Sequence, residues 1–460
     1  MVNGEFLSQL AAVVDDKTMV AGADIGAAHS VDTSGEYPCL PELLLRPGST
    51  EELSAIIKLC GTHQQPYVVQ GGMTGVSGGA TPNPGEVAIS LMRLRGIEEI
   101  DENAFTVTAR AGTPLEEIQQ AVAVKGLSFP LDIGARGSCT VGGIAATNAG
   151  GNQVIRYGVA RNLILGLEVV LADGTVLTSL TKVLKNNTGY DLKQLFIGSE
   201  GTLGVITRVV LRLVPQCETF TTFCAVNSFS DVLQLFRLSN QYFSGAVSAF
   251  EVMWQDYMAA VLAAGEDLTS PFAEQYPFYV LLEIDVERPD GAMEWFENGL
   301  AQALEQELIQ DAVIAKTDSE REKLWRIREG IGEVVAQMGL AVHCDVAVDA
   351  SGLEAYVTEV ERNIGEQFPD NQLLVFGHLG DGNLHITVSA NSEAEKTALY
   401  NIIFSSAARH GGMISGEHGL GSLKRDYLSY TRTEAEVQWM RKLKQLFDPN
   451  NCLNPHRVLG

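Results

Sequence analysis

Two short glycine-framed motifs late in the chain hold four of its eight histidines. The first has His378 and His385 on either side of a turn at residues 381–383. If the flanking segments pair as strands, both imidazoles can face one cation. The second motif offers Glu417 and His418 between glycines. Two histidines and one carboxylate are a common ligand set for Zn²⁺ or Mn²⁺ that leaves positions open for a substrate.

Each of these residues also has a simpler interpretation. A single histidine is more often a core or surface residue with ordinary partners, and Glu417 could cap a helix. Taken alone, the set would also suit a metal-dependent hydrolase, because a bound divalent ion can activate water. A second kind of motif is therefore needed to separate hydrolysis from other metal-assisted chemistry.

Three glycine-rich segments in the first half of the chain supply that motif, at residues 71–79, 132–143 and 198–204. Glycine lets backbone N–H groups curl around an anion, and nearby Ser and Thr hydroxyls add donors. Several such loops together could hold the pyrophosphate of a dinucleotide. None follows the G-x-G-x-x-G or G-x-x-x-x-G-K-[ST] pattern, which argues against a Rossmann NAD site and a P-loop.

Length and charge narrow the class of protein. A chain of 460 residues exceeds what one core usually supports, so two or three units are expected. The net charge of −25 opposes binding to nucleic acid or anionic lipid. An enzyme acting on anionic acids would need a cation or basic residues at its site to overcome the negative electrostatic potential of this acidic chain.

Other composition features exclude several further classes. The longest apolar runs fall short of the roughly 20 residues that a membrane-spanning helix needs. Seven scattered cysteines without C-x-x-C spacing favour neither a zinc ribbon, an iron–sulfur cluster nor a disulfide framework. Residues 1–16 carry acidic residues and no basic stretch before an apolar one, so we expect no targeting peptide and a cytoplasmic location.

The hydrophobic pattern predicts alternating short strands and helices in the glycine-rich half, followed by longer helices between strands. We expect helices at 50–62, after Pro114, and at 229–240, 291–306, 319–337 and 434–447, and strands at 66–70, 105–109, 202–215, 278–284 and 342–348. The pattern at residues 166–176 predicts a strand, an Asp-Gly turn and a second strand. A boundary near Pro215 divides the chain into residues 1–215, a cap at 216–433 and a C-terminal helical segment at 434–460.

The ordered motifs resemble the FAD domain of the vanillyl-alcohol oxidase and p-cresol methylhydroxylase flavoproteins. The matching segments are 130–134, 147–151, 156–158, 187–192 and 198–204. Within this superfamily the chain is most similar, over about residues 41–455, to the FAD-linked D-2-hydroxy-acid dehydrogenases that act on D-2-hydroxyglutarate or D-lactate. The resemblance implies an α+β fold: a two-subdomain FAD-binding domain, a cap with an antiparallel sheet, and a C-terminal segment that returns to the FAD domain.

The resemblance also implies which residues contact FAD. The first glycine segment would hold the pyrophosphate, residues 130–143 would lie along the flavin and ribityl chain, and residues 204–206 would contact the adenine side. The implied set is Gln70, Gly71, Gly72, Met73, Thr74, Gly75, Ser77, Gly78, Pro130, Asp132, Gly134, Gly137, Ser138, Gly142, Gly143, Asn148, Gly150, Tyr157, Glu200, Gly201, Gly204, Ile206 and Asn454. Relatives that bond flavin covalently through the first segment have histidine where Met73 stands, so we expect non-covalent FAD.

By the same resemblance, His378, His385 and Glu417 are metal ligands and His418 is the catalytic base. Oxidation of an α-hydroxy acid requires loss of the hydroxyl proton as the C2 hydride leaves for the flavin. A divalent ion that chelates the hydroxyl and the carboxylate eases this loss, and a neutral imidazole can accept the proton. The resemblance implies that Arg328 binds the substrate carboxylate. Without the resemblance, Arg328 would be interpreted as a helix-surface arginine paired with Glu329 or Glu333.

Three predicted substrate-binding positions depart from the family pattern. D-2-Hydroxyglutarate dehydrogenases have a threonine, a lysine and an asparagine where this chain has Gly332, His343 and Thr387. Histidine is largely neutral at pH 7, so it only partly replaces lysine. Loss of one charged hydrogen bond costs about 1.5–3 kcal/mol. D-2-Hydroxyglutarate, D-lactate and a bulkier D-2-hydroxy acid therefore all remain candidate substrates.

Two flavin-based alternatives stay open beside the hydrolase. One is an oxidase of the same fold that returns electrons to O₂, and the other is a flavin-binding module without catalysis. Because the sequence contains no iron–sulfur motif, we expect an external electron acceptor, for which the resemblance suggests an electron-transferring flavoprotein. The ligand set suits Zn²⁺, Mn²⁺ and Co²⁺ alike, and a homodimer is compatible with the sequence.

Overall fold

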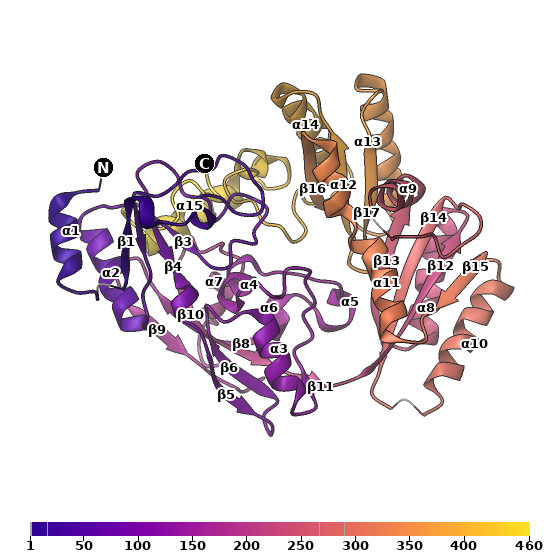
Figure 1. Ribbon diagram of the computed structural model, residues 1–460, viewed down its shortest axis with the longest axis horizontal. Coiled ribbons are helices and arrows are strands. Elements are labelled where there is room, and N and C mark those ends of the chain that lie inside the picture. Colours follow the sequence, from indigo (N-terminus) through magenta and orange to yellow (C-terminus); the bar gives the residue numbers. More distant parts are fainter. Residues whose placement is uncertain (1, 16, 266, 289) are drawn as a thin grey trace. The chain divides into compact units, whose positions relative to one another are not determined.

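The chain forms two units, each assembled from segments that are distant in the sequence. The computed structural model describes residues 2–15, 17–265, 267–288 and 290–460 (Figure 1). Met1 and Asp16, the ends of the segment expected not to be a targeting peptide, lie outside the described residues. Unit 1 comprises residues 1–151, 158–216 and 417–460, and unit 2 comprises residues 152–157 and 217–416.

The first sheet of unit 1 has the strand order β1-β2-β4-β3. Strands β2 and β3 run parallel to β4, and β1 runs antiparallel to β2. Helix α2 begins after Ser49, whose hydroxyl accepts the backbone N–H of Glu52, so the predicted capped helix is confirmed. The elements are α1 (Gly4–Ala11), β1 (Met19–Ala21), η1 (Gly22–Asp24), η2 (Ala27–His29), β2 (Leu43–Leu45), α2 (Thr50–Thr62), β3 (Tyr67–Gln70), β4 (Val87–Ser90) and η3 (Leu91–Arg93).

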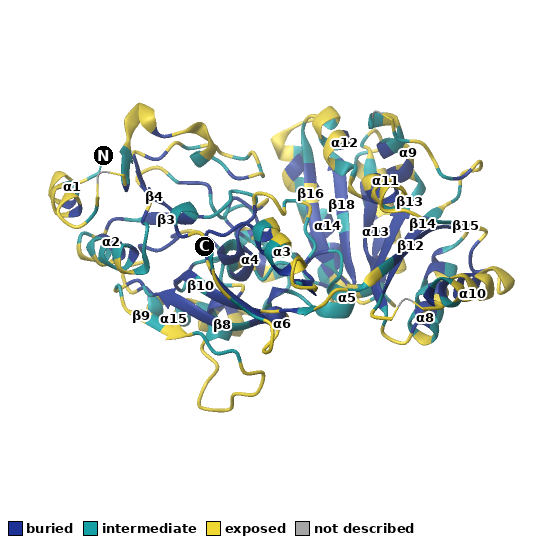
Figure 2. Ribbon diagram, turned by 60° about the horizontal axis from the view of Figure 1, so that its bottom comes forward, coloured by how far each residue is buried: buried dark blue, intermediate teal, exposed yellow. Residues whose placement is uncertain are grey.

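The second sheet of unit 1 is antiparallel, with the order β5-β6-β10-β8-β9. Its elements and the surrounding ones are β5 (Ile97–Asp101), β6 (Thr106–Arg110), α3 (Leu115–Ala123), β7 (Leu127–Ser128), α4 (Val141–Thr147), α6 (Ala160–Leu163), β8 (Ile164–Val170), β9 (Val176–Ser179), α7 (Lys193–Phe196), β10 (Val205–Arg212) and β11 (Val214–Pro215). Strands β8 and β10 are largely buried (Figure 2). The long connection between β9 and α7 is mostly exposed.

The C-terminal segment completes unit 1. It contains η5 (Arg425–Tyr430) and α15 (Glu434–Phe447), and α15 has the predicted bounds. Beyond α15, the Tyr67 N–H donates to the Cys452 carbonyl, and the Asn454 N–H donates to the Tyr67 carbonyl. The tail thus lies alongside β3 within unit 1.

Unit 2 is built on a seven-stranded sheet with the order β15-β12-β14-β13-β17-β18-β16. Every pairing in it is antiparallel, as expected for the cap. The strands are β12 (Glu218–Val226), β13 (Val247–Trp254), β14 (Phe278–Val286), β15 (Asp311–Ile314), β16 (Ala341–Ala347), β17 (Leu373–His378) and β18 (Asn383–Ser389). The helices are α5 (Val154–Tyr157), α8 (Phe229–Tyr242), α9 (Gln255–Ala264), α10 (Ala292–Glu305), α11 (Asp318–Glu329), α12 (Ile331–Met338), α13 (Leu353–Gln367), η4 (Leu379–Asp381) and α14 (Glu393–Arg409).

Helices pack on both faces of this sheet. On one face, Tyr257 of α9 and Trp325 of α11 share a buried apolar cluster with Phe376 of β17. On the other face, Phe236 of α8 packs edge-on against Phe250 of β13, with ring centroids 5.0 Å apart. Alternate residues of each strand therefore face different helices. Glu251 of β13 and His378 of β17 lie on the α9–α11 side.

The structure differs from the sequence prediction at one helix and at the segment borders. The helix predicted at 319–337 is divided into α11 and α12 at Gly330, where a Cβ atom would lie 2.5 Å from Val261 Cγ1. Residues 417–433, predicted in the cap, belong to unit 1. Residues 152–157 belong to unit 2, because Arg156 donates to the carbonyls of Ala246 and Asp285.

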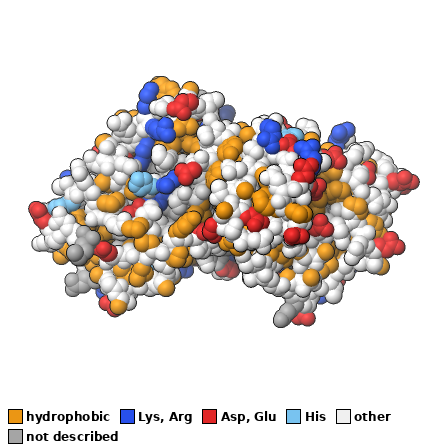
Figure 3. Space-filling view, turned by 90° about the horizontal axis from the view of Figure 1, so that it is seen from above, with side chains coloured by type: hydrophobic (Ala, Val, Ile, Leu, Met, Phe, Trp, Pro, Cys, Tyr) orange, Lys and Arg blue, Asp and Glu red, His pale blue; other side chains and the backbone are white. Residues whose placement is uncertain are grey.

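Two exclusions drawn from composition can be checked in the structure. Within the described ranges, no helix has the length and apolar character needed to cross a membrane. All seven cysteines remain as thiols, as expected. On the face seen in Figure 3, hydrophobic, acidic and basic side chains are scattered, and acidic and basic ones adjoin in several places.

Candidate active site

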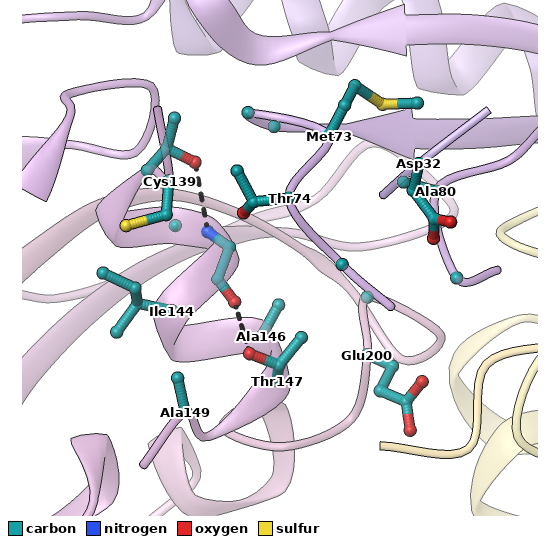
Figure 4. A pocket seen from close by; sticks show the side chains of 18 of the residues that line it. Asp32, Met73, Thr74, Ala80, Cys139, Ile144, Ala146, Thr147, Ala149 and Glu200 are labelled. Carbon is teal, nitrogen blue, oxygen red and sulfur yellow. Dashed lines mark hydrogen bonds between the residues drawn. The ribbon is translucent and has the colours of Figure 1, made fainter. Parts of the chain in front are cut away.

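A cavity of about 350 Å³ lies within unit 1 and is lined by parts of all three glycine-rich segments. Figure 4 shows Met73 and Thr74 from the first segment, Cys139 from the second and Glu200 from the third, with Ile144 of α4 just after the second. The segments come from the end of β3, from α4 with the loop before it, and from the loop before β10. The structure therefore brings together the three segments that the sequence singled out.

Close backbone contacts explain the glycines around this cavity. A Cβ atom on Gly72 would lie 1.9 Å from the Ser138 carbonyl oxygen, so the first and second segments touch without room for a side chain. A Cβ atom on Gly142 would lie 2.6 Å from the Ala111 Cβ. Met73 has a φ of +58°, so the first segment curls tightly. Glycines make up part of the lining, where backbone N–H groups can approach a pyrophosphate and donate to it.

The predicted FAD-binding residues divide into two groups. Those that line the cavity are Gly71, Gly72, Met73, Thr74, Gly75, Ser77, Gly142, Gly143, Gly150, Glu200, Gly201, Gly204, Ile206 and Asn454. Those outside the lining are Gln70, Gly78, Pro130, Asp132, Gly134, Gly137, Ser138, Asn148 and Tyr157.

Several residues of the second group have structural roles. Asn148 ends α4 in the left-handed conformation, and its Oδ1 accepts the Arg161 N–H. Gln70 is fully buried and donates to the carbonyls of His29 and Ala80, which shapes the first glycine segment. Tyr157 belongs to unit 2, where its hydroxyl donates to Asp285 at 3.0 Å. These side chains act on the surrounding structure, not on the cavity surface.

Asp32 lines the cavity and was missed by the sequence prediction (Figure 4). Its loop is fastened to the first glycine segment, because the Thr33 N–H donates to the Met73 carbonyl at 3.1 Å. Burial raises the pKa of the Asp32 carboxyl, and the hydrogen bonds from Ser34 only partly oppose that effect. No motif surrounds Asp32 in the sequence, so only the fold could reveal it.

The second predicted motif, Glu417 and His418, also lies on the cavity lining. Ser77 donates its hydroxyl to the His418 carbonyl at 3.1 Å. The Glu200 carboxylate accepts the backbone N–H groups of Leu420 and Gly421 at 2.9 and 2.8 Å. The first and third glycine segments thus hold the backbone around His418 at the cavity.

The histidine hairpin lies in unit 2, at the junction of β17 and β18. The two strands pair, as predicted, and His378 is the register partner of Asn383. The His378 and His385 ring centroids are 5.3 Å apart, and one nitrogen of each ring lies within 4.8 Å of the other. Both rings can therefore contribute to a single cation, which the turn geometry had suggested.

Arg328 is buried, so it is not the helix-surface arginine of the alternative interpretation. It is 5% exposed, and its Nε donates to Glu251 at 2.6 Å. The other Glu251 oxygen lies 2.7 Å from His378 Nδ1, and Arg328 Nη2 lies 3.4 Å from His378 Nε2. The sequence prediction therefore named two members of a buried triad and missed the third.

Glu251 is ionised in this triad. Burial alone raises its pKa, but attraction to His378 and Arg328 and the hydrogen bonds from both residues outweigh burial and lower the pKa to about 2. The carboxylate is 1% exposed. A buried charge of this kind is tolerated because both of its oxygens are paired.

The positions that depart from the family pattern lie on β16, β18 and α12 of unit 2. His343 and Thr387 are register partners, and His343 Nδ1 lies 3.2 Å from the Thr387 hydroxyl. A Cβ atom on Gly332 would meet nothing within 4 Å. Replacing a larger residue by Gly332 therefore leaves open space instead of allowing a neighbour to pack there.

Gly416 lies beside the histidine hairpin within unit 2 and directly precedes Glu417 in the chain. Gly416, the last residue of unit 2, donates its N–H to the Asp345 carbonyl at 3.0 Å, and Asp345 is the register partner of His385. A Cβ atom on Gly416 would lie 2.5 Å from Asn383 Oδ1. The next Cα, that of Glu417, is about 3.8 Å from that of Gly416 across a trans peptide.

Comparison with known proteins agrees with this division into two units. Residues 41–179 match a family described as the FAD binding domain, and residues 217–458 match the C-terminal domain of FAD linked oxidases. The matches correspond to the cavity unit and to the unit with the histidine hairpin, the latter match continuing into the C-terminal segment.

Similar full-length proteins carry related names. A D-2-hydroxyglutarate dehydrogenase of Stutzerimonas stutzeri is 33% identical over all of both chains. A mitochondrial D-2-hydroxyglutarate dehydrogenase of Bos taurus is 40% identical over 91% of this chain and 77% of its own. A putative mitochondrial D-lactate dehydrogenase of Schizosaccharomyces pombe is 37% identical over 94% of this chain and 84% of its own.

Solved structures share the fold at low sequence identity. An alkyldihydroxyacetonephosphate synthase superposes with a TM-score of 0.77 at 16% identity, over 99% of this chain and 85% of the other. A p-cresol methylhydroxylase superposes with a TM-score of 0.74 at 13% identity, over 99% and 96%. These neighbours confirm the expected p-cresol methylhydroxylase-type fold. The chain belongs to the FAD-linked oxidase family, among the D-2-hydroxy-acid dehydrogenases, and is an FAD-dependent oxidoreductase.

Proposed function

We propose that the chain is a divalent-metal-dependent dehydrogenase that oxidises a D-2-hydroxy acid, of the D-2-hydroxyglutarate or D-lactate type, to the 2-oxo acid. The observation that carries this proposal is the buried triad of Glu251, Arg328 and His378 next to a second histidine. A cation site beside a buried arginine matches the hydroxyl and the carboxylate of an α-hydroxy acid. The relatives' names support the same substrate class.

The proposal gives each residue one task. His378 and His385 would hold a Zn²⁺ or Mn²⁺ ion with Glu417, which follows Gly416 directly in the chain. When bound, this ion lowers the pKa of the substrate hydroxyl, and FAD accepts the C2 hydride. Arg328 binds the carboxylate through its charged fork.

His418 accepts the hydroxyl proton in this scheme. It lies on the lining of the unit 1 cavity, and Ser77 holds its backbone carbonyl at 3.1 Å. A histidine at the cofactor cavity is suited to general base catalysis at neutral pH. Since His418 follows Glu417 directly, one short segment would carry both a metal ligand and the base.

The outer part of the substrate pocket leads us to propose a broad substrate range. His343 and Thr387 pair with each other, and Gly332 leaves open space on α12. This surface has less fixed positive charge than the family pattern provides for a second carboxylate. We infer that D-lactate or a bulkier D-2-hydroxy acid competes well with D-2-hydroxyglutarate.

Anaerobic reduction of the bound flavin tests the reaction. The absorbance of the FAD-loaded protein near the flavin maximum should bleach with D-2-hydroxyglutarate, D-lactate or a bulky D-2-hydroxy acid, and not with their L-enantiomers. Equal bleaching by the L-enantiomers would contradict the D-specific part. No bleaching by any of the acids would contradict the dehydrogenase itself. Hydrogen peroxide release in air would instead favour the oxidase.

Further parts of the proposal have separate tests. Non-covalent FAD should leave the polypeptide on acid precipitation, because Met73 cannot form the histidine bond. Metal analysis of the purified protein should find about one Zn²⁺ or Mn²⁺ per chain. Reduced enzyme should pass electrons to an external acceptor such as an electron-transferring flavoprotein. The cytoplasmic location and the homodimer likewise belong to the proposal.

A further inference from the structure

Glu251 lies at the centre of the unit 2 cluster without belonging to either sequence motif. It is on β13, and its antiparallel register partner on β17 is His378. Directly opposed residues of an antiparallel pair project from the same face, so the sheet itself brings the two side chains together. The contact depends on strand register and not on a loop.

Each oxygen of the Glu251 carboxylate serves a different partner. One accepts the Nε–H of Arg328 at 2.6 Å, and the other lies 2.7 Å from His378 Nδ1. With the hydrogen of a neutral His378 on Nδ1, the Nε2 lone pair faces Arg328 Nη2 at 3.4 Å, and a cation bound by His378 would take the place of that contact. A carboxylate on the second nitrogen of a ligating histidine fixes the tautomer and the ring orientation and makes the ring a stronger ligand.

We propose that Glu251 is a positioning residue that aligns the metal ligand His378 and the substrate-binding Arg328 with a single buried carboxylate. This inference rests on the proposed function and deepens it. Because the ion and the arginine would hold adjacent groups of one substrate, coupling them through Glu251 keeps their separation constant. The stacking of Arg328 over Phe376, 4.8 Å from the ring centroid, restrains the same guanidinium from a second side.

The same sheet contains a matched residue that does not touch the histidines. Glu283 on β14 is also fully buried. Like Glu251, it binds an arginine of α11, with Arg321 Nε at 2.6 Å, and it also accepts from Trp325 Nε1 at 2.7 Å. Glu283→Gln thus makes the same change of a buried carboxylate to an amide, but at a position that bonds to Arg321 and Trp325 instead of a proposed metal ligand.

The test compares Glu251→Gln with Glu283→Gln in the full-length, FAD-loaded protein. The measurement is the dissociation constant for Zn²⁺ or Mn²⁺, from competition with a chelator, together with the FAD content. We expect Glu251→Gln to bind the ion about 10- to 100-fold more weakly, which is the usual effect of losing such a partner. Glu283→Gln should bind it within about threefold of the wild type, and both variants should retain FAD.

The outcomes separate this inference from the proposed function. Wild-type affinity in Glu251→Gln, or an equal loss in Glu283→Gln, overturns the positioning role alone. A wild-type protein that binds neither ion overturns the metal part of the proposed function as well. If Glu251→Gln does not fold, Glu251→Asp keeps the charge on a shorter side chain. It should also lose metal affinity, and wild-type affinity in this folded variant would overturn the proposal.

Discussion

The two units build their functional surfaces in opposite ways. The lining of the unit 1 cavity is rich in glycine, at contacts where a Cβ atom would come as close as 1.9 Å to another chain segment. The unit 2 cluster is made of polar side chains from the sheet and from α11, with Glu251 joined to Arg328 and His378. FAD binding in the unit 1 cavity should therefore be weakened by added side-chain atoms. The function of the unit 2 cluster should be weakened by the removal of a charged side chain.

His418 is the strongest test of this contrast, because it contributes an imidazole side chain to the cavity that the glycine-rich segments line. Its replacement in His418→Gln should slow flavin reduction by a D-2-hydroxy acid by about 10²- to 10⁴-fold, the usual effect of losing a general base. FAD content should not change, since the glycine segments bind the cofactor. Anaerobic stopped-flow absorbance measures the rate.

His63→Gln is the matched control, because His63 is a partly exposed histidine of unit 1 that does not line the cavity, and its Nε2 contacts Gln9 at 3.0 Å. It should reduce flavin at the wild-type rate. A His418→Gln variant that also does so would remove His418 from the proposed chemistry.

The second prediction concerns a buried ion pair that unit 1 uses for stability instead of catalysis. Arg457 and Glu86 are 2% and 3% exposed, and Arg457 Nη2 donates to Glu86 at 2.8 Å. Glu86→Gln leaves the guanidinium charge buried without its counter-charge, so the free energy of unfolding should fall by about 3–5 kcal/mol. Urea unfolding, followed by circular dichroism, measures this loss.

An exposed ion pair of the same unit provides the comparison. Lys125 and Glu102 are 46% and 55% exposed at 2.8 Å, so Glu102→Gln should leave the unfolding midpoint unchanged. If Glu86→Gln behaves like Glu102→Gln, the C-terminal tail does not depend on the buried pair.

The contrast between the units also explains what the sequence could predict. Glycine is visible as a residue type, so the three segments around the cavity were found directly. The hairpin of His378 and His385 was found because a turn between two histidines is a local pattern. The helix cap at Ser49 and the bounds of α15 are local for the same reason.

Features that depend on long-range pairing were not predicted. Glu251 and His378 are 127 residues apart and meet only through the register of β13 and β17. Asp32 reaches the cavity through a loop that bonds to Met73, 40 residues away. The break at Gly330 follows from the approach of α9, which periodicity within one helix cannot reveal. The family resemblance identified Arg328, but it did not identify Glu251, whose carboxylate binds Arg328.

Arg328→Lys is the third prediction and probes the side-chain surface of unit 2. Lysine keeps the charge but loses the planar fork that binds Glu251 and a carboxylate together. Losing one charged hydrogen bond costs about 1.5–3 kcal/mol, so kcat/KM for a D-2-hydroxy acid should fall about 10- to 100-fold. Arg321→Lys on the same helix pairs with Glu283 instead, and its kcat/KM should match the wild type. Equal losses would point to a general effect on α11.

The smallest predicted effect tests the backbone wall of unit 1 with two single methyl groups. Gly72→Ala places a Cβ atom 1.9 Å from the Ser138 carbonyl, whereas Gly134→Ala meets nothing within 4 Å. Overpacking of this kind costs about 1–3 kcal/mol, so FAD should bind about 5- to 100-fold more weakly to Gly72→Ala. Gly134→Ala should bind FAD like the wild type. Flavin fluorescence on titration of the apoprotein measures both constants. If the two variants bind FAD equally, close backbone contact is not what forms the cavity, and the contrast between the two units fails at its first step.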